Sequence, residues 1–193
     1  MQKGWHSRGY LPHFDSMDIV QFVTFRLADS LPEQALERIA RAAQPESLRD
    51  EMLDRGWGAC WLRSDIVATL VENAFYAFDG ERYRLHAWTI MPNHVHVLIT
   101  MMPTSSLGTV VSSWKRFTAR KANEHLDRRG SFWQNDYWDR FIRNEAHFAA
   151  TTSYIDQNPV KAGLVARASE WPHGSARFAK EDAPLEWRAP SKD

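Results

Sequence analysis

Cysteine is almost absent from this sequence, which has Cys60 as its one thiol. A single cysteine excludes an intramolecular disulfide framework, so we expect a reducing, cytoplasmic setting. No apolar run approaches the roughly 20 residues that a membrane-spanning helix needs, and the first residues lack the apolar core of a signal peptide. Internal repeats and low-complexity segments are missing as well. We therefore expect one domain over residues 1–167, an extension over residues 168–193, and no membrane partner.

Net charge is also missing, because 24 Lys and Arg residues balance 24 Asp and Glu residues. The charge is nevertheless polarised along the chain. Residues 28–82 hold six arginines against eleven acidic residues, whereas residues 107–167 hold ten basic residues against six acidic ones. A polarised surface attracts a phosphate backbone on one side, and the alternative is that both halves carry ordinary solvated helix faces. The nine tryptophans either fill a core or form platforms on which unpaired bases stack.

The first half of the chain predicts one strand followed by helices. Residues 19–27 are rich in β-branched and aromatic side chains and predict a strand. Pro32 opens a predicted helix over residues 32–43, which Pro45 ends. Residues 46–61 are acidic and we expect them to be irregular. A firmer helix is predicted from a cap at Ser64 to about residue 79, because its apolar positions follow the 3.6-residue period.

The second half predicts a hairpin, a helix, a strand and a last helix. The hairpin spans residues 82–101 and the basic helix residues 107–129. A fourth strand is predicted over residues 132–143, with a break near Asn135 and Asp136, and a helix from a cap at Asn144 to Asn158, which precedes a proline. This order predicts an α+β fold with a ferredoxin-like β-α-β-β-α-β core and a four-stranded antiparallel sheet. A helical insertion follows the first strand, and a C-terminal helix follows the last.

The hairpin carries a pair of histidines in the sequence HAWTIMPNHVHVLIT, residues 86–100. Side chains two apart on a strand point to the same face, so His94 and His96 are predicted to lie side by side. Two imidazoles on a rigid strand are half of a divalent-metal site. The alternative is a pair of half-buried histidines that are satisfied by hydrogen bonds.

Tyr154 and Asn158 lie four residues apart on the last predicted helix and hence on one helical face. If that face meets the hairpin, Asn158 completes a metal triad with His94 and His96, and Tyr154 stands one turn away. A phenol becomes a useful nucleophile when a cation or a base assists it. The alternatives are that Asn158 caps a new helix at Pro159 and that Tyr154 is a core residue.

Five stretches of the chain resemble a known protein family. They are RGYLPHFD, DGERYRLHAWTIMPNHVHVLI, SSWKRFTARKAN, FWQNDYWDRFIRNEAHF and YIDQNPVKAGLV, which together span most of residues 8–165. On these motifs the sequence resembles the REP-associated tyrosine transposases, a branch of the single-tyrosine HUH transposases. The resemblance implies a ferredoxin-like fold and a metal-dependent single-stranded DNA endonuclease and strand transferase. It also implies a 5′-phosphotyrosine intermediate and palindromic hairpin DNA as the target.

The resemblance assigns roles to four residues. His94, His96 and Asn158 fall on the family's metal ligands, with Mg²⁺ or Mn²⁺ as the cofactor, and Tyr154 falls on its nucleophile. We expect a monomer or homodimer that acts at the nucleoid. The candidate DNA-binding residues are the cations of the basic helix and of the fourth strand, namely Lys115, Arg116, Arg120, Lys121, Arg140 and Arg143.

Two other functions compete with this interpretation. A nucleotide hydrolase with a histidine triad needs a third histidine at position 98, where this chain has Leu98. A non-catalytic protein that binds single-stranded nucleic acid on its sheet surface needs neither the histidines nor the tyrosine. Within the enzymatic interpretation, Tyr137 is the competitor of Tyr154 for the role of nucleophile.

Overall fold

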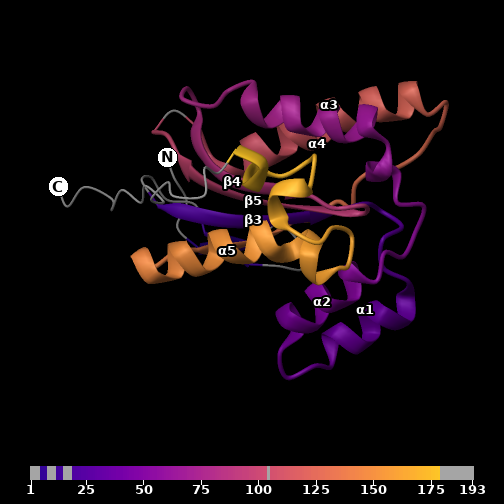
Figure 1. The fold of residues 1–193 in the computed structure, drawn as a ribbon, viewed down its shortest axis with the longest axis horizontal. Coiled ribbons are helices and arrows are strands. Elements are labelled where there is room, and N and C mark those ends of the chain that lie inside the picture. Colours follow the sequence, from indigo (N-terminus) through magenta and orange to yellow (C-terminus); the bar gives the residue numbers. More distant parts are fainter. Residues whose placement is uncertain (1–4, 8–11, 15–18, 104, 179–193) are drawn as a thin grey trace.

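The computed structural model describes residues 5–7, 12–14, 19–103 and 105–178. Its main sheet has four antiparallel strands, and β3, β4 and β5 are labelled in Figure 1. Their order across the sheet is β4-β5-β3-β6. With the chain order β3, helices, β4, β5, helix, β6, this spatial order is that of a β-α-β-β-α-β ferredoxin-like fold, which confirms the predicted fold. A separate two-stranded hairpin pairs β1 (Trp5–Ser7) with β2 (Pro12–Phe14). The sheet strands are β3 (Val20–Arg26), β4 (Tyr83–Ile90), β5 (His94–Met101) and β6 (Trp138–Phe141).

Helices cover both faces of the sheet (Figure 1). The α3–α4 face is covered by α3 (Asp65–Tyr76) and α4 (Leu107–His125), and the α5 face by α5 (Glu145–Lys161). A further pair, α1 (Glu33–Ala40) and α2 (Pro45–Asp54), lies beside one end of the α5 layer. No helix in the described ranges is long and apolar enough to cross a membrane. The short 3₁₀ turns are η1 (Trp61–Arg63), η2 (Ala168–Glu170) and η3 (Ser175–Phe178).

Residues along β5 alternate between the two faces. Val95 and Val97 belong to the large core beneath α3 and α4, whereas Leu98 belongs to a smaller cluster beneath α5. His94 and His96 therefore lie on the α5 face with Leu98, as the two-residue period of a strand predicts. The face that the histidines share is thus the one that α5 covers.

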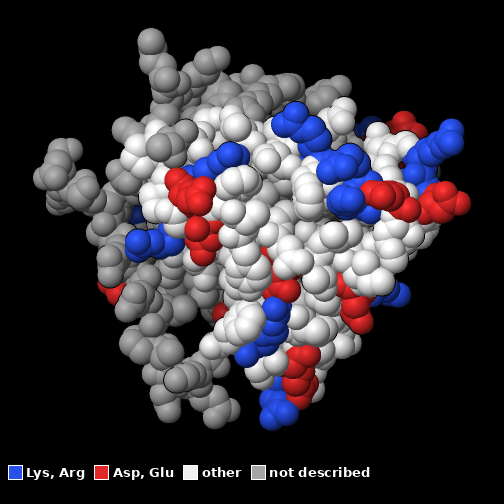
Figure 2. Space-filling model, turned by 90° about the horizontal axis from the view of Figure 1, so that it is seen from above, with Lys and Arg blue, Asp and Glu red and all other residues white. Residues whose placement is uncertain are grey.

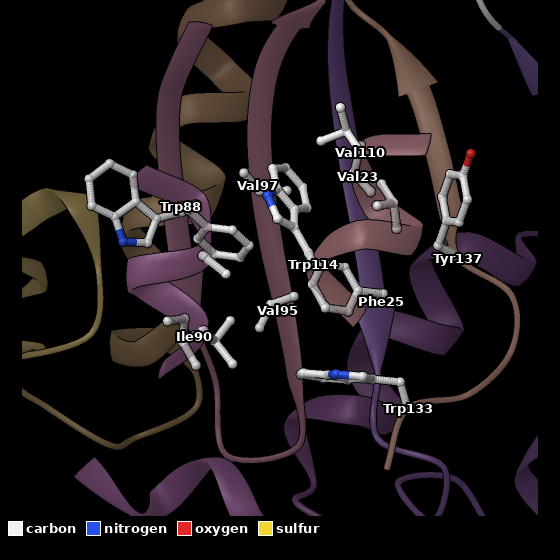
Figure 3. Packing of buried hydrophobic residues seen from close by; sticks show 14 of the residues in the cluster. Val23, Phe25, Trp88, Ile90, Val95, Val97, Val110, Trp114, Trp133 and Tyr137 are labelled. Atoms are coloured by element: carbon white, nitrogen blue, oxygen red, sulfur yellow. The ribbon is translucent and has the colours of Figure 1, made fainter. Parts of the chain in front are cut away.

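Three of the seven tryptophans for which burial is described are fully inside the core and form no exposed platform. Trp88, Trp114 and Trp133 are buried in the α3–α4 core (Figure 3). Each indole nitrogen has an internal hydrogen-bond partner; Trp114, for example, donates to the Tyr83 hydroxyl at 3.1 Å. Of the two alternatives for the tryptophans, the core therefore holds for these three. Trp138 differs, because it is half-buried on the α5 face.

The stretch that we expected to be irregular contains a helix. Pro45 is the first residue of α2 and does not merely end the preceding helix. The missing N–H of proline is harmless in a first turn, and Glu46 adds a favourable charge there. Met52 and Leu53 are buried against α1 in a small core of their own. This helix turns out to reach the candidate site.

The last helix and the fourth strand also differ from their predicted bounds. The helix does not end at Asn158, because Pro159 is accommodated inside α5, which continues to Lys161. Gly163, with a φ of 70°, ends it instead. The strand predicted over residues 132–143 is broken where expected, because Trp133 makes an isolated bridge to Leu27 and β6 begins only at Trp138. It also ends two residues early, at Phe141.

The segment that follows α5 packs along β4. The backbone N–H of Ile90 donates to the His173 carbonyl at 2.8 Å, and the Trp171 indole donates to the Ile90 carbonyl at 3.2 Å. This part of the predicted extension therefore lies on the domain as far as residue 178. The RGYLPHFD motif lies mostly outside the described residues, as does Tyr10.

Candidate active site

The two histidines turn the same ring nitrogen toward each other. The distance between His94 Nε2 and His96 Nε2 is 3.1 Å, and both side chains are fully buried. His96 Nδ1 lies 2.7 Å from Thr24 Oγ1, and His94 Nδ1 lies 2.8 Å from Asn93 Oδ1. Asn93 uses its amide N–H groups on the Leu53 and Trp57 carbonyls. Its Oδ1 is therefore an acceptor, which leaves the Nε2 lone pair of His94 facing His96.

Burial keeps both imidazoles neutral. The pKa of His94 is lowered well below its ordinary value, first by burial and then by the neighbouring His96. Burial also lowers the pKa of His96 to about 3, with Arg49 and Lys161 adding to the effect. A neutral imidazole with a free nitrogen is the form that binds metal ions. Burial therefore favours the neutral form of both rings, which is the form that a metal site needs.

Helix α5 brings Tyr154 and Asn158 to the same layer. The Asn144 side chain caps the helix by accepting a hydrogen bond from the His147 N–H at 2.8 Å, as predicted. The Tyr154 ring packs edge-on against His96, with ring centroids 5.4 Å apart. Asn158 lies one turn further on and is buried, and neither polar atom of its amide has a hydrogen-bond partner among the described residues.

Helix α2 adds two carboxyl groups that the sequence analysis missed. The Tyr154 hydroxyl donates a hydrogen bond to Asp50 Oδ2 at 2.9 Å. Burial and the charge of Asp50 together raise the pKa of Tyr154. Asp54 Oδ1 lies 4.0 Å from His94 Nε2, and neither oxygen of Asp54 has a hydrogen-bond partner in the described part of the chain. Burial raises the pKa of Asp54 to about 6, against the opposing effect of Lys161.

Two features of this layer fit a divalent cation. Two nitrogens that bind one ion at about 2.1 Å and at right angles lie about 3 Å apart, close to the separation of the two Nε2 atoms. Asn158 offers a buried amide oxygen without a partner, which is a ligand type that Mg²⁺ and Mn²⁺ accept. No three His, Cys, Asp or Glu side chains converge as a metal site within the described ranges. On this layer, the amide oxygen of Asn158 is therefore the candidate third ligand.

The other tyrosines lie away from the histidines. Tyr137 and Tyr83 are buried in the α3–α4 core on the opposite face of the sheet, and Figure 3 shows the Tyr137 ring in that core. The Tyr83 hydroxyl donates to the Phe75 carbonyl at 2.7 Å. Tyr76 is an exposed residue of α3. Among the tyrosines that the structure describes, Tyr154 alone contacts the histidine pair.

The predicted DNA-binding cations divide between the two faces. Arg140 lies on the α5 face, with its guanidinium carbon 5.4 Å from the centroid of the Trp138 ring. The side chain of Arg143 is exposed just before α5. The four cations of the basic helix belong to α4, across the sheet from the histidines. Figure 2 looks onto the α3–α4 layer and shows blue side chains gathered toward the right-hand side, with acidic side chains between them.

Lys115 is the least available of these cations. Its amine donates to the Asn135 carbonyl at 2.8 Å and to the Asp136 carbonyl at 3.2 Å. Burial lowers its pKa to about 8. Beside it, a groove of about 560 Å³ lies between α4 and residues 130–137, with Arg116 among its lining residues. Lys115 therefore holds this loop against α4, whereas Arg116 and Arg120 are exposed.

Comparison with known proteins gives one consistent result. The family model described as "Transposase IS200 like" matches residues 61–158, which include the hairpin, α4 and most of α5. The chain is 27% identical over 131 residues to the REP-associated tyrosine transposase of Escherichia coli strain K12, an alignment that covers 65% of this chain and 77% of the relative. Its fold is similar to that of a REP-associated tyrosine transposase solved bound to a REP hairpin. That structure gives a TM-score of 0.61 and 17% identity, and the match covers 96% of this chain and 94% of the solved chain.

Proposed function

Because this chain belongs to the IS200-like transposase family, we propose that it cleaves and rejoins single-stranded DNA at palindromic hairpins. It acts as a metal-dependent endonuclease and strand transferase, and Tyr154 forms a 5′-phosphotyrosine intermediate. One observation carries the proposal. The tyrosine packs on a histidine pair whose Nε2 atoms converge, on the helix that also supplies an unpartnered amide.

Each residue of the site has a task in this chemistry. Tyr154 supplies the attacking oxygen, and its ring packs edge-on against both His96 and Phe22. His94, His96 and Asn158 hold Mg²⁺ or Mn²⁺, while Thr24 and Asn93 fix the two rings through Nδ1. When bound, a divalent cation polarises a phosphodiester oxygen and so supplies an electrophile. A phosphotyrosine conserves the energy of the phosphodiester, so that rejoining needs no nucleotide cofactor.

Two observations support a DNA hairpin as the substrate: what a solved relative binds, and the cations on the surface of this chain. The solved relative is bound to a REP hairpin, and this chain offers cations on both faces of its sheet. Arg140 and Trp138 flank the histidine layer, where an aromatic ring and a guanidinium suit an unpaired base and its phosphate. Arg116, Arg120 and Lys121 on α4, together with Arg143, supply sequence-independent phosphate contacts.

The test is covalent capture. Labelled single-stranded DNA hairpins are incubated with the protein and Mn²⁺, and a denaturing gel reveals any protein–DNA adduct. Wild type is expected to form the adduct, and Tyr154→Phe is expected to form none, because the attacking oxygen is missing. Tyr137→Phe is the matched control and should retain the adduct, since Tyr137 lies in the opposite core.

Hairpin binding by each variant, measured without cleavage, separates loss of chemistry from loss of folding. Persistent binding by Tyr154→Phe without an adduct supports the proposal. An adduct that maps to a tyrosine other than Tyr154 contradicts the assigned nucleophile. Binding by wild type without an adduct on any hairpin of a panel favours a non-catalytic nucleic-acid-binding protein. A triad hydrolase is disfavoured because the third position on the histidine face is Leu98, which is buried.

A further inference from the structure

The Tyr154 hydroxyl donates a hydrogen bond to a carboxyl group on α2, a helix that belongs neither to the sheet nor to the helices α3, α4 and α5 that cover it. Asp50 lies on α2, 104 residues before Tyr154, and the distance between its Oδ2 and the tyrosine oxygen is 2.9 Å. Helix α2 belongs to the α1–α2 pair, which has its own small core. The family model begins at residue 61, so this helix lies outside the matched region.

The geometry points to Asp50 as a catalytic residue, the group that takes the proton from the Tyr154 hydroxyl during attack and returns it during rejoining. This inference rests on the proposed function, because it concerns the same nucleophile. It assigns a general base to the site, contributed by a helix that the hairpin and α5 motifs do not contain.

The environment of Tyr154 makes such a base necessary. A phenol is a weak nucleophile at neutral pH until a base or a cation assists it, and the base within reach here is the carboxylate 2.9 Å away. The proton must therefore leave as the oxygen attacks. His96 is unsuited to receive it, since one ring nitrogen faces Thr24 and the other faces His94. Within the described residues, Asp50 is the side chain that accepts a hydrogen bond from this hydroxyl.

The two oxygens of Asp50 have different partners. Oδ2 accepts from Tyr154, and Oδ1 lies 3.3 Å from the guanidinium of Arg49. Arg49 is held over the Trp138 ring, with its guanidinium carbon 4.7 Å from the ring centroid. The Asn93 amide ties the end of α2 to the hairpin by donating to the Leu53 carbonyl. The carboxyl group is thus oriented from both sides, as in-line proton transfer requires.

Cleavage and rejoining each form one bond to phosphorus and break another. The Tyr154 oxygen forms a bond to phosphorus while the bond from phosphorus to the 3′ oxygen of the leaving strand breaks. The phenolic proton moves to Asp50 Oδ2, and the 3′ oxygen leaves as a hydroxyl with a proton from solvent. In rejoining, a 3′ hydroxyl attacks the phosphotyrosine and gives its proton to solvent. Asp50 then returns its proton to the departing tyrosine oxygen.

Other charged groups also face Tyr154, and the test must separate them from Asp50. Asp54 and Arg49 on α2 carry opposite charges near it, and the His96 ring packs against its ring. We therefore measure single-turnover adduct formation on labelled hairpin DNA with Mn²⁺ from pH 6 to 9.5. The variants are Asp50→Asn, Asp50→Glu and Glu51→Gln. Glu51 is the matched control, because it is an exposed acid of the same helix that pairs with Arg55 at 2.8 Å.

Asp50→Asn keeps an acceptor for the tyrosine but cannot take its proton. Adduct formation should fall about 10²- to 10⁴-fold at pH 7, the usual contribution of general base catalysis. The remaining rate should rise with pH, because hydroxide from solvent must then remove the phenolic proton. Hairpin binding should be unchanged, Asp50→Glu should recover part of the rate, and Glu51→Gln should match wild type.

Three outcomes overturn the assignment. An Asp50→Asn rate within about threefold of wild type, with the same pH profile, makes Asp50 a structural residue. A faster Asp50→Asn variant makes the hydrogen bond a restraint on the resting tyrosine. Equal losses of adduct-formation rate in Asp50→Asn and Glu51→Gln would show that the rate depends on the total charge of α2 and not on proton transfer to Asp50. If wild type itself forms no adduct at any pH, the proposed function fails, and the role of Asp50 fails with it.

Discussion

Thr24 controls which nitrogen of His96 is available to a ligand. The two residues are direct partners across the β3–β5 pair, and the threonine hydroxyl lies 2.7 Å from Nδ1. Groups that bind the far nitrogen of a metal-ligating histidine fix its tautomer and the direction of its ring. Thr24 itself has no place in the sequence motifs, because only strand pairing brings it to the site.

Thr24→Val should lower the affinity for Mn²⁺ about 10- to 100-fold, the usual cost of losing such a partner. Valine has nearly the shape of threonine but leaves the His96 ring free to choose its tautomer. Thr89→Val is the matched control, because Thr89 is the partner of His96 on the other neighbouring strand and its hydroxyl contacts Met91 instead. Calorimetric titration without DNA gives both affinities. Equal affinities of the two variants for Mn²⁺ would show that the Thr24 hydroxyl does not contribute to metal binding.

Helix α2 sets the limit of what the sequence could predict about this site. His94 with His96, and Tyr154 with Asn158, are related by local periods of two and four residues, so their shared faces follow from the sequence. The contact of Tyr154 with Asp50 spans 104 positions and has no local period. The helix itself left a weak signal. Pro45 fits a helix start as well as a helix stop, and we interpreted it only as a stop.

The strands and the three longer helices were predictable for a different reason. Their apolar positions repeat over enough residues to distinguish a period of two from one of 3.6, as in β5 and α4. The bounds were less predictable. The continuation of α5 past Pro159 depends on packing, since Asn158 and Pro159 are both buried. Local rules about the residue before proline favour a helix end there.

Met52→Ala tests whether the α1–α2 pair positions the site as a unit. Met52 is completely buried in the small core that joins the two helices. Truncation should destabilise this pair by about 2–5 kcal/mol. Hydrogen exchange is expected to show lost protection in α1 and α2 while the sheet remains protected, and adduct formation should slow because Asp50 is no longer fixed.

Leu36→Ala is the control for this prediction. Leu36 lies on α1 but is 41% exposed, so its truncation should leave both exchange and adduct formation close to wild type. Uniform loss of protection across the whole sheet in Met52→Ala would show that the pair does not unfold separately.

At the scale of the whole molecule, zero net charge conceals two separate sets of cations. One set borders the histidine layer at Arg140, and the other lies on α4 across the sheet. A hairpin that contacts both sets must extend beyond one face. Long-range attraction to DNA then depends on the distribution of charge and not on its sum.

Arg116→Ala combined with Arg120→Ala should weaken hairpin binding and make it less sensitive to salt. Each lost phosphate contact lowers the slope of log affinity against log salt by about 0.7 to 0.9, so the double variant should lose up to about 1.8. Fluorescence anisotropy across a salt series measures the slope. Lys115→Ala is the comparison, because its amine is occupied by loop carbonyls and it should change the slope little. An unchanged slope in the double variant would show that Arg116 and Arg120 are exposed to solvent and do not contact phosphates.

The order of the strands also determines when the site can exist during synthesis. The central strand β3 must wait for β5, and then for β6, to be made before either of its edges is paired. The chain emerges at roughly 5–20 residues per second, so Tyr154 follows Asp50 by roughly 5 to 20 seconds. Until then, β3 and the helix α2 are present without α5. Under the proposed function, a nascent chain held beside messenger RNA therefore lacks its nucleophile, because α5, which carries Tyr154, joins the fold among its last elements.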